Sequence, residues 1–372
     1  MTIKVTGRVA SRLHALACDK ITQSHLAALN EINAKSVKPS QWEAKFVAHL
    51  CKAMADVAKV WGSELAAAKT GAGVSMATVF THQSPYVKWK NGMINKRCEL
   101  ADVLLAIIDR RANTPTGVAI LVQAKLSSTG NVRLSSKSEK NQFDLFSTRP
   151  KFDLVSALAP TGIDLSGLSP DSALLYGLTG PSVAALPSNF SWPHFWLTAD
   201  DLHRSAGTYA VSGEDCLAFT LVGMLLGNFG WGFALPPKGS DWTKLAAASP
   251  RDDWSTLINY LLAQTFSKPL SAAQSVSMGR LRRGQEDIVH LASKNPAGQR
   301  MFFIGNGMAD SATSQYLGGG FDNDNEDWEV VSPDNGHAFD GGDDSTDGGE
   351  QLVTDVPPEG GPLSAILFEV GG

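Results

Sequence analysis

Three polar side chains stand inside two strongly apolar segments of the chain. Asp102 lies near the start of the first segment (LADVLLAIID, residues 100–109), and Gln123 and Lys125 lie near the end of the second (VAILVQAKL, residues 118–126). A hairpin about the polar turn between them places Asp102 opposite Lys125, with Gln123 on the same face, because side chains alternate with a period of two. A slip of one residue in this register would scatter the group to opposite faces. Since an unpaired charge in an apolar sheet is costly, the three groups are expected to pair with one another or to bind a metal or a substrate.

These residue types suit one kind of chemistry. A carboxylate together with amide or carbonyl oxygens is a ligand set for Mg²⁺ or Mn²⁺ rather than for zinc. A lysine beside such an ion can orient and help to deprotonate an attacking water, and the combination can hydrolyse a phosphodiester bond. The simpler alternative is a salt bridge between Asp102 and Lys125, with Gln123 as a hydrogen-bonded neighbour.

The spacing Glu99-x-x-Asp102, followed after about twenty residues by Gln123-x-Lys125, resembles the PD-(D/E)XK (restriction-endonuclease-like) nuclease superfamily in its Q-x-K variant. The resemblance covers roughly residues 40–150 and is similar to the nuclease effectors of bacterial antiphage defence systems. It implies an α/β (α+β) restriction-endonuclease-like core, in which a mixed central sheet is flanked by helices.

The resemblance also implies roles for individual residues. Asp102 would be the central metal ligand, Gln123 would stand where a second acidic residue is usual, and the Ala124 backbone carbonyl would be a further ligand. Lys125 would activate the water. Because Gln123 lacks a charge, another acid is expected to help, and Glu99 is the nearest candidate.

Three more residues are candidates on the same grounds. Glu64, on the preceding helix, would be a further metal ligand, although a surface role is the alternative. His82, in the upstream sequence His82-Gln-Ser-Pro85, and Gln142, on the following helix, would contact substrate. A structural histidine and a solvated glutamine are the alternatives for these two.

The elements that must position these residues follow from local patterns. Helices are expected over residues 40–69, 137–148 and 253–266, where apolar residues recur at three- and four-residue steps. Ser40 and Glu43 form a capping box for the first of them. Residues 74–90 are β-branched and aromatic, which predicts an extended segment.

Four regions follow: an N-terminal helical segment (1–39), the nuclease core (40–155), a mainly helical region of unknown role (156–317) and an acidic low-complexity tail (318–372) that ends in a short apolar run. The tail is expected to be disordered. The uncharged stretch at residues 217–235 predicts a buried helix that ends in a glycine-rich turn rather than a membrane span.

Charge is distributed unevenly. All 32 Lys and Arg lie in residues 1–300, and 14 of the 37 Asp and Glu lie in residues 321–372, so the first 320 residues carry a balance of +9. A basic body beside an acidic tail is typical of proteins with polyanionic partners, and the nuclease resemblance implies that this partner is DNA. The alternative is a body whose charge only keeps it soluble, with a solvated tail. The four cysteines are far apart and form no C-x-x-C pair, which predicts neither a structural zinc nor a disulfide framework and favours a reducing, cytoplasmic location.

Two functions of different classes remain open. The first is a metal-dependent endonuclease that cuts DNA with Mg²⁺ or Mn²⁺ and is activated by self-oligomerisation, by a ligand or by a regulatory partner such as an ATPase; the acidic tail could then occupy the basic groove. The second is a catalytically inactive nuclease-fold subunit that binds nucleic acid or a partner protein in a defence complex. A weaker hypothesis takes the terminal Gly371-Gly372 as a docking or conjugation tail.

Overall fold

The structure is a computed structural model, and it describes residues 3–38, 42–79, 85–111, 115–126, 134, 136–155, 159–169, 173–180, 195–198, 202–205, 208–211, 216–235, 252–267, 291–293, 302–304, 328–330 and 364–371. The helices are α1 (Gly7–Ala34), α2 (Trp42–Ala67), α3 (Lys137–Thr148), α5 (Leu217–Leu226) and α7 (Asp253–Ser267). The strands of the N-terminal part are β1 (Gly73–Val79), β2 (Tyr86–Asn91), β3 (Ile94–Glu99), β4 (Val103–Asp109), β5 (Thr116–Leu126) and β6 (Asp153–Leu154). Those of the remainder are β7 (Leu174–Thr179), β8 (Phe195–Thr198), β9 (Leu202–Ser205), β10 (Thr208–Val211), β11 (Trp231–Ala234), β12 (Leu291–Ser293), β13 (Phe302–Ile304), β14 (Trp328–Val330) and β15 (Ser364–Gly371).

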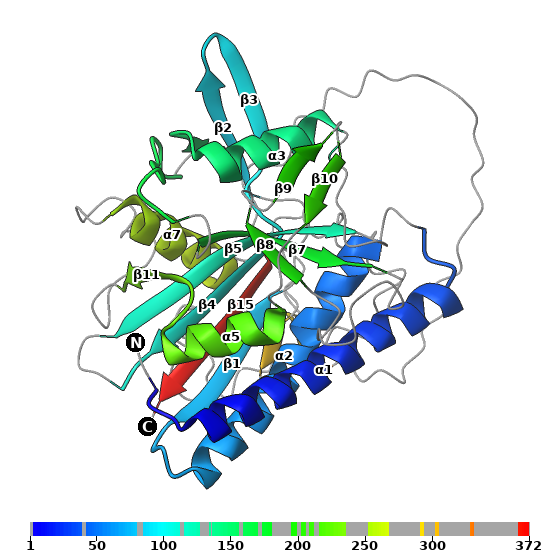
Figure 1. Cartoon of the computed structure of the whole chain (residues 1–372), viewed down its shortest axis with the longest axis vertical. Helices are drawn as coiled ribbons and strands as arrows, with labels where there is room; N and C mark the ends of the chain where they lie inside the picture. The colour runs from blue at the N-terminus through cyan, green and yellow to red at the C-terminus, as the bar shows by residue number, and fades with distance from the viewer. Residues whose placement is uncertain are drawn as a thin grey trace.

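A mixed sheet forms the centre of the molecule (Figure 1). Its strands run in the order β13-β1-β15-β4-β5-β7-β8, and β11 pairs with β5 as well. The pairs β15–β4 and β5–β7 are parallel and the others are antiparallel. The predicted mixed central sheet flanked by helices is therefore confirmed.

Both faces of this sheet are buried, which explains why β4 and β5 are apolar almost throughout. Alternate residues of β4 point into different cores: Leu105 packs with α1, α2 and α5, whereas Leu104 packs with α3 and α7. Figure 1 shows α1 and α2 lying side by side across the sheet. The predicted helices over 40–69, 137–148 and 253–266 correspond to α2, α3 and α7.

Helices α1 and α2 pack antiparallel and are linked at both ends. The Trp61 indole N–H donates to the Leu13 carbonyl at 2.8 Å. At the other end, the Glu31 carboxylate is buried between Lys45, whose ammonium donates to it, and His49, whose Nε2 lies 2.6 Å from Glu31 Oε2. These ties fix α2, and with it the residues at its N-terminus, relative to α1.

The apolar run near residue 372 is a central strand and not the end of a loose tail. β15 inserts between β1 and β4, with Gly371 paired to Gly73 and Phe368 paired to Ile107. Arg110, which follows β4, pairs with Glu369 of β15, and its Nε lies 2.7 Å from Glu369 Oε1. This ion pair joins the ends of the two strands. The idea that Gly371-Gly372 follows a free docking tail is therefore wrong. Of the predicted disordered tail, residues 318–327, 331–363 and 372 lie outside the described residues.

The boundary proposed at residue 155 does not separate two folds. β7 pairs with β5 in parallel, so the central sheet continues into the region predicted to be a mainly helical unit. Within the described residues, that region holds α5 and α7 and the strands β7 to β13. The described residues of this region thus contain strands as well as helices. Short strand segments between Pro- and Gly-rich loops have too little periodicity to be distinguished from helix by pattern. The rest of the region expected to be mainly helical lies outside the described residues.

The uncharged stretch at residues 217–235 forms α5, which ends at Gly227 in the left-handed conformation (φ 77°), and then β11. This agrees with the predicted helix and glycine-rich turn. No helix among the described residues combines the length and apolarity needed to cross a bilayer.

Candidate functional site

The hairpin of β4 and β5 carries the predicted cluster, in a register two residues from the expected one. The ladder pairs Val103 with Val122, and the Asp102 N–H donates to the Val122 carbonyl at 2.9 Å. Asp102 therefore lies opposite Gln123, and the expected position opposite Lys125 is wrong. Since the shift is two residues, the three polar side chains still share one face of the sheet.

Asp102 is held by groups of β5. Its Oδ2 accepts hydrogen bonds from the Gln123 side-chain amide and from the Ala124 N–H, the latter at 2.7 Å. The N–H and C=O of one strand residue point to the same side of the strand, so the Ala124 carbonyl lies on the β4 side of β5. Gln123 is 1% exposed, and its Oε1 has no hydrogen-bond partner among the described residues. The Asp102 carboxylate thus lies beside an amide side chain and a backbone amide of β5, and carboxylate, amide and carbonyl oxygens are ligand types that Mg²⁺ or Mn²⁺ prefers.

Glu43 belongs to this site, although the sequence analysis used it only as a helix cap. It lies in the first turn of α2, and the Leu126 backbone at the end of β5 hydrogen-bonds to its carboxylate. Burial raises the pKa of Glu43 to about 7, the charge of Asp102 adds to this rise, and Lys125 opposes it.

Glu64 does not join the site. Its carboxylate lies 3.2 Å from Arg12 of α1. Because α2 is continuous and rises about 1.5 Å per residue, Glu64 is roughly 30 Å along the helix axis from Glu43. The resemblance suggested a glutamate of this helix as a metal ligand, and Glu64 was the candidate. The first turn of α2, which carries Glu43, lies at the hairpin, whereas the last turns, which carry Glu64, do not.

Lys125 lies among carboxylates. Burial alone would lower the pKa of Lys125, but the charges of Glu43, Asp102, Glu139 and Glu99 outweigh it, and the pKa is raised. Burial raises the pKa of Glu99 well above its usual range, and Asp102 raises it further. The predicted placement of Glu99 beside Asp102 thus agrees with the structure, and Lys125 carries its proton.

Helix α3 adds a second residue that the sequence analysis missed. Glu139 completes a capping box, in which its carboxylate accepts from the Ser136 N–H at 2.8 Å, and its charge also acts on Lys125. One turn further, Gln142 is buried and shares a helix face with Phe146. The Phe146 ring packs 5.6 Å from that of Tyr176.

Tyr176 pairs with Gln123 across β5 and β7, so Gln142 faces the side of the sheet that carries the cluster. Its Oε1 has no hydrogen-bond partner among the described residues. His82, the other predicted substrate contact, lies outside the described residues.

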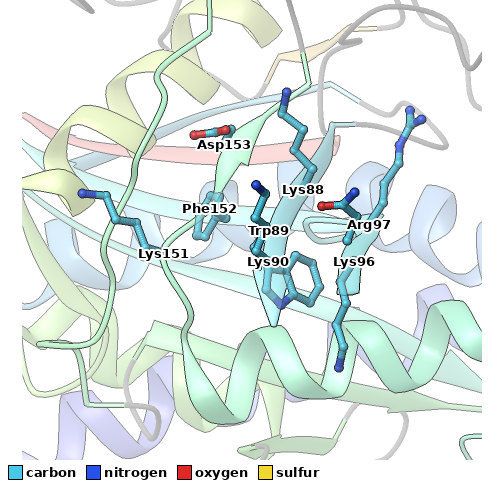
Figure 2. Close-up of a pocket in the computed structure, with 9 residues that line it drawn as sticks. Lys88, Trp89, Lys90, Lys96, Arg97, Lys151, Phe152 and Asp153 are labelled. Atoms are coloured by element: carbon cyan, nitrogen blue, oxygen red, sulfur yellow. The ribbon is translucent and has the colours of Figure 1, made fainter. Parts of the chain in front are cut away.

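The β2–β3 hairpin leads away from this cluster and carries a basic face. Lys88 pairs with Arg97, and Tyr86 pairs with Glu99 at the base. Because side chains repeat every two residues, Lys88, Lys90 and Arg97 share the face on which Glu99 lies. Figure 1 shows the hairpin projecting from the body, and Figure 2 shows Lys88 and Arg97 pointing away from Lys96. The opposite face is anchored to α3, since the Lys96 ammonium pairs with Asp144.

A groove of about 680 Å³ runs along this hairpin. Its lining includes five cations, Lys88, Lys90, Lys96, Arg97 and Lys151, and one acid, Asp153. Trp89 and Phe152 form its apolar floor (Figure 2). At the hairpin tip, Met93 is fully exposed and Ile94 is 62% exposed. A cationic groove with an apolar tip fits a polyanionic partner.

A second polar cluster lies outside this site. Among the described residues, one group of three His, Cys, Asp or Glu side chains brings all its ligand atoms within 4.8 Å of one another, and it consists of His14, Cys18 and Cys216. Hydrogen bonds with Cys18 and His14 outweigh burial and lower the pKa of Cys216 to about 4. The acidic side chains around Asp102 do not converge as closely. A cation there would therefore be held by Asp102, the Gln123 oxygen and the Ala124 carbonyl.

Comparisons with protein-family models, with curated proteins and with solved structures returned no match for this chain.

Proposed function

We propose that this protein is a metal-dependent endonuclease that hydrolyses DNA phosphodiester bonds. The observation that carries the proposal is the convergence of Asp102, Gln123 and Lys125 at the end of one buried hairpin, beside Glu99 and Glu43. Such a concentration of half-buried carboxylates around one lysine, at the end of a sheet that is otherwise apolar, is costly unless it serves a ligand.

The residues fit Mg²⁺ or Mn²⁺. Gln123 Oε1 is a buried oxygen without a hydrogen-bond partner among the described residues, and the pKa of Glu99 is raised because burial and neighbouring negative charge both disfavour its ionised form. A divalent cation would relieve both conditions. When bound, it would polarise the scissile phosphate and make the attacking water more acidic.

Lys125 and Glu43 would have separate roles in the reaction. Lys125 is protonated, so it donates to a non-bridging phosphate oxygen and orients the water. Glu43, which a bound cation would favour in its ionised form, is the better acceptor for the proton of that water near neutral pH. Lys125 would thus stabilise charge, and the activation of water that the resemblance assigned to it falls to Glu43.

The basic face of the β2–β3 hairpin supports DNA as the substrate. Lys88, Lys90 and Arg97 form a cationic track that ends at Glu99 and hence at the cluster. Phosphate contacts of this kind give affinity without sequence preference and position the backbone. The same surface would leave the scissile bond near Asp102.

A nuclease without sequence preference must be controlled in a cell. We propose that the protein acts as an effector of bacterial antiphage defence and is activated by self-oligomerisation, by a ligand or by a partner such as an ATPase. The acidic residues 331–363 are the internal candidate for restraint, since they could compete with DNA for the hairpin.

Cleavage of plasmid DNA by the full chain, with Mg²⁺ or Mn²⁺, tests the proposal. Asp102→Ala, Lys125→Ala and Glu43→Ala should each lower the rate by at least about 100-fold, as general acid–base and charge-stabilising groups do. Glu64→Ala is the matched control on the same helix and should cleave at the wild-type rate. Equal loss in Glu43→Ala and Glu64→Ala would refute the site.

One observation favours the second candidate function, an inactive nuclease-fold subunit. Gln123 donates to Asp102 and so supplies a hydrogen bond where a second carboxylate would bind metal. A wild-type chain that binds DNA but never cleaves it, with or without Mn²⁺ and candidate partners, would establish this alternative.

A further inference from the structure

His14, Cys18 and Cys216 form a cluster that the nuclease proposal does not use. His14 and Cys18 are one turn apart on α1 and therefore share a helix face. Cys216 is the N-cap of α5, and 202 residues separate it from His14. Cys216 is buried, whereas His14 and Cys18 are half-buried and leave the cluster accessible from one side.

The three side chains lie close enough together to share one ion, because their ligand atoms are within 4.8 Å of one another. Cys18 Sγ and Cys216 Sγ each lie 3.5 Å from His14 Nε2, and Cys18 Sγ lies 3.8 Å from Nδ1. In tetrahedral coordination, with bonds of about 2.3 Å to sulfur and about 2.1 Å to nitrogen, sulfur and nitrogen are about 3.6 Å apart. Both sulfurs lie near this separation from Nε2. Because Cys18 Sγ also lies close to Nδ1, the imidazole must turn about its Cβ–Cγ bond before the Nε2 lone pair points at the ion.

Hydrogen bonding accounts for the arrangement less well. One imidazole nitrogen carries either a single proton or a single in-plane lone pair, so it serves one partner at a time. Here two sulfurs approach the same nitrogen, Nε2 of His14. An ion that accepts electron pairs from all three atoms satisfies the nitrogen and both sulfurs together.

We propose that His14, Cys18 and Cys216 bind one Zn²⁺, with water in the fourth position, and thereby fasten α1 to the N-terminus of α5. Two thiolates and an imidazole form the soft and borderline ligand set that zinc prefers and that Mg²⁺ does not. The N-terminus of α5 favours the thiolate form of Cys216. Binding releases the thiol protons to solvent and changes no oxidation state.

This zinc is distinct from the cation of the nuclease proposal, which would be held by oxygen atoms of β4 and β5. It joins two helices that cover the same face of the central sheet. Its loss is therefore expected to lower the stability of the α1–α5 contact without altering the ligands of the nuclease cation.

Cobalt substitution tests the proposal on the reduced, full-length chain after removal of metal with a chelator. Titration with Co²⁺ should give a thiolate-to-cobalt charge-transfer band that saturates at one equivalent, and Zn²⁺ should abolish that band. His14→Ala, Cys18→Ser and Cys216→Ser should each weaken zinc binding by more than about 100-fold, the upper limit for loss of an outer-shell partner. Cys98→Ala, a buried cysteine elsewhere, is the control and should bind as the wild type does.

Two further measurements test the zinc site even if a variant does not fold. X-ray absorption at the zinc edge of the wild-type chain should show two sulfur neighbours and one imidazole, whether or not a variant folds. A titration without the charge-transfer band, or one in which Cys216→Ser keeps it, would overturn the proposal. A Cys18–Cys216 disulfide in chain purified without reductant, combined with failure to bind Co²⁺ after reduction, would identify a redox pair instead.

Discussion

Gln123 faces Asp102 one residue beyond the last pair of the β4–β5 ladder and donates its side-chain amide to Asp102 Oδ2. The pair joins the two strands at the end where the carboxylates gather. It also leaves Gln123 Oε1 buried without a hydrogen-bond partner among the described residues. The balance between this hydrogen bond and a bound cation decides between the two candidate functions.

Gln123→Glu should make the stability of the protein depend on divalent cations. Two carboxylates facing each other repel without metal, so the free energy of unfolding should fall by roughly 1–3 kcal/mol, and Mn²⁺ should restore it. Thermal unfolding with and without Mn²⁺ measures both effects. Gln123→Met, which removes the oxygen without adding charge, should show no stabilisation by Mn²⁺. A Gln123→Glu protein indifferent to Mn²⁺ would argue against a cation site.

Glu43→Gln should change how stability varies with pH. The pKa of Glu43 is raised from 4.5 to about 7, so the folded state holds its proton more tightly than the unfolded state. The contribution of Glu43 to the free energy of unfolding is therefore greatest below pH 4.5, where the carboxyl is protonated in both states. It is lost as the pH rises from 4.5 towards 7. Glu43→Gln should therefore be more stable than wild type at pH 8, by roughly 1–3 kcal/mol, and nearly equal to it at pH 4.5. Urea unfolding at the two pH values tests this, and a difference of the same size at both would contradict it.

The hairpin face should control DNA affinity through charge alone. Replacing Lys88, Lys90 and Arg97 with Ala should weaken binding at low salt. The slope of log K against log salt concentration should become shallower by about 3, at roughly 0.9 per lost phosphate contact. Fluorescence anisotropy over a salt series measures this slope. Lys4→Ala with Lys59→Ala, exposed lysines outside the hairpin, is the control and should leave it unchanged.

Glu31 should be essential to the α1–α2 contact. Glu31→Ala leaves Lys45 buried without its carboxylate, a loss that costs about 3–5 kcal/mol. The double variant Glu31→Leu with Lys45→Met should recover most of the stability, because no lysine ammonium is left buried without a carboxylate and His49 can be neutral. Denaturant unfolding measures the stability of the single and the double variant. If the two are equally stable, the unpaired charge of Lys45 is not the cause of the destabilisation.

Restraint by residues 331–363 can be tested only if β15 is kept. Truncation before residue 364 removes a strand from the centre of the sheet and should prevent folding. Replacing the Asp and Glu of residues 331–363 with Asn and Gln keeps β15, and it should raise DNA affinity if these residues compete for the hairpin. Unchanged affinity and cleavage would exclude autoinhibition by this segment.

The elements with strong local patterns were predictable. Helix α3 begins at the capping box of Ser136 and Glu139 and ends before Pro150, and its bounds match the prediction. The β4–β5 hairpin followed from its apolar runs, but its register did not, because a polar turn of unknown conformation leaves the pairing free to shift. The shift by two preserved the shared face of Asp102, Gln123 and Lys125.

Non-local relationships were not predictable. Nothing near residues 364–371 indicates that they insert between β1 and β4, and the acidic segment before them suggested a tail. The choice between Glu43 and Glu64 depends on which end of α2 meets the hairpin, which is decided by its packing on α1. The His14–Cys18 spacing was visible in the sequence, but its third member is 202 residues from His14.

The position of β15 has a consequence for biosynthesis. Arg110, which follows β4, and its partner Glu369 are 259 residues apart in sequence. At translation rates of about 5–20 residues per second, roughly 15–50 seconds pass between the synthesis of β4 and that of β15, the strand that pairs with its second edge. During that interval β4 has one unpaired edge, the edge that β15 later occupies, and an open apolar edge is prone to aggregation. Chaperone occupancy on the ribosome should therefore be high until β15 is made, and the sheet beneath Asp102 is completed only then.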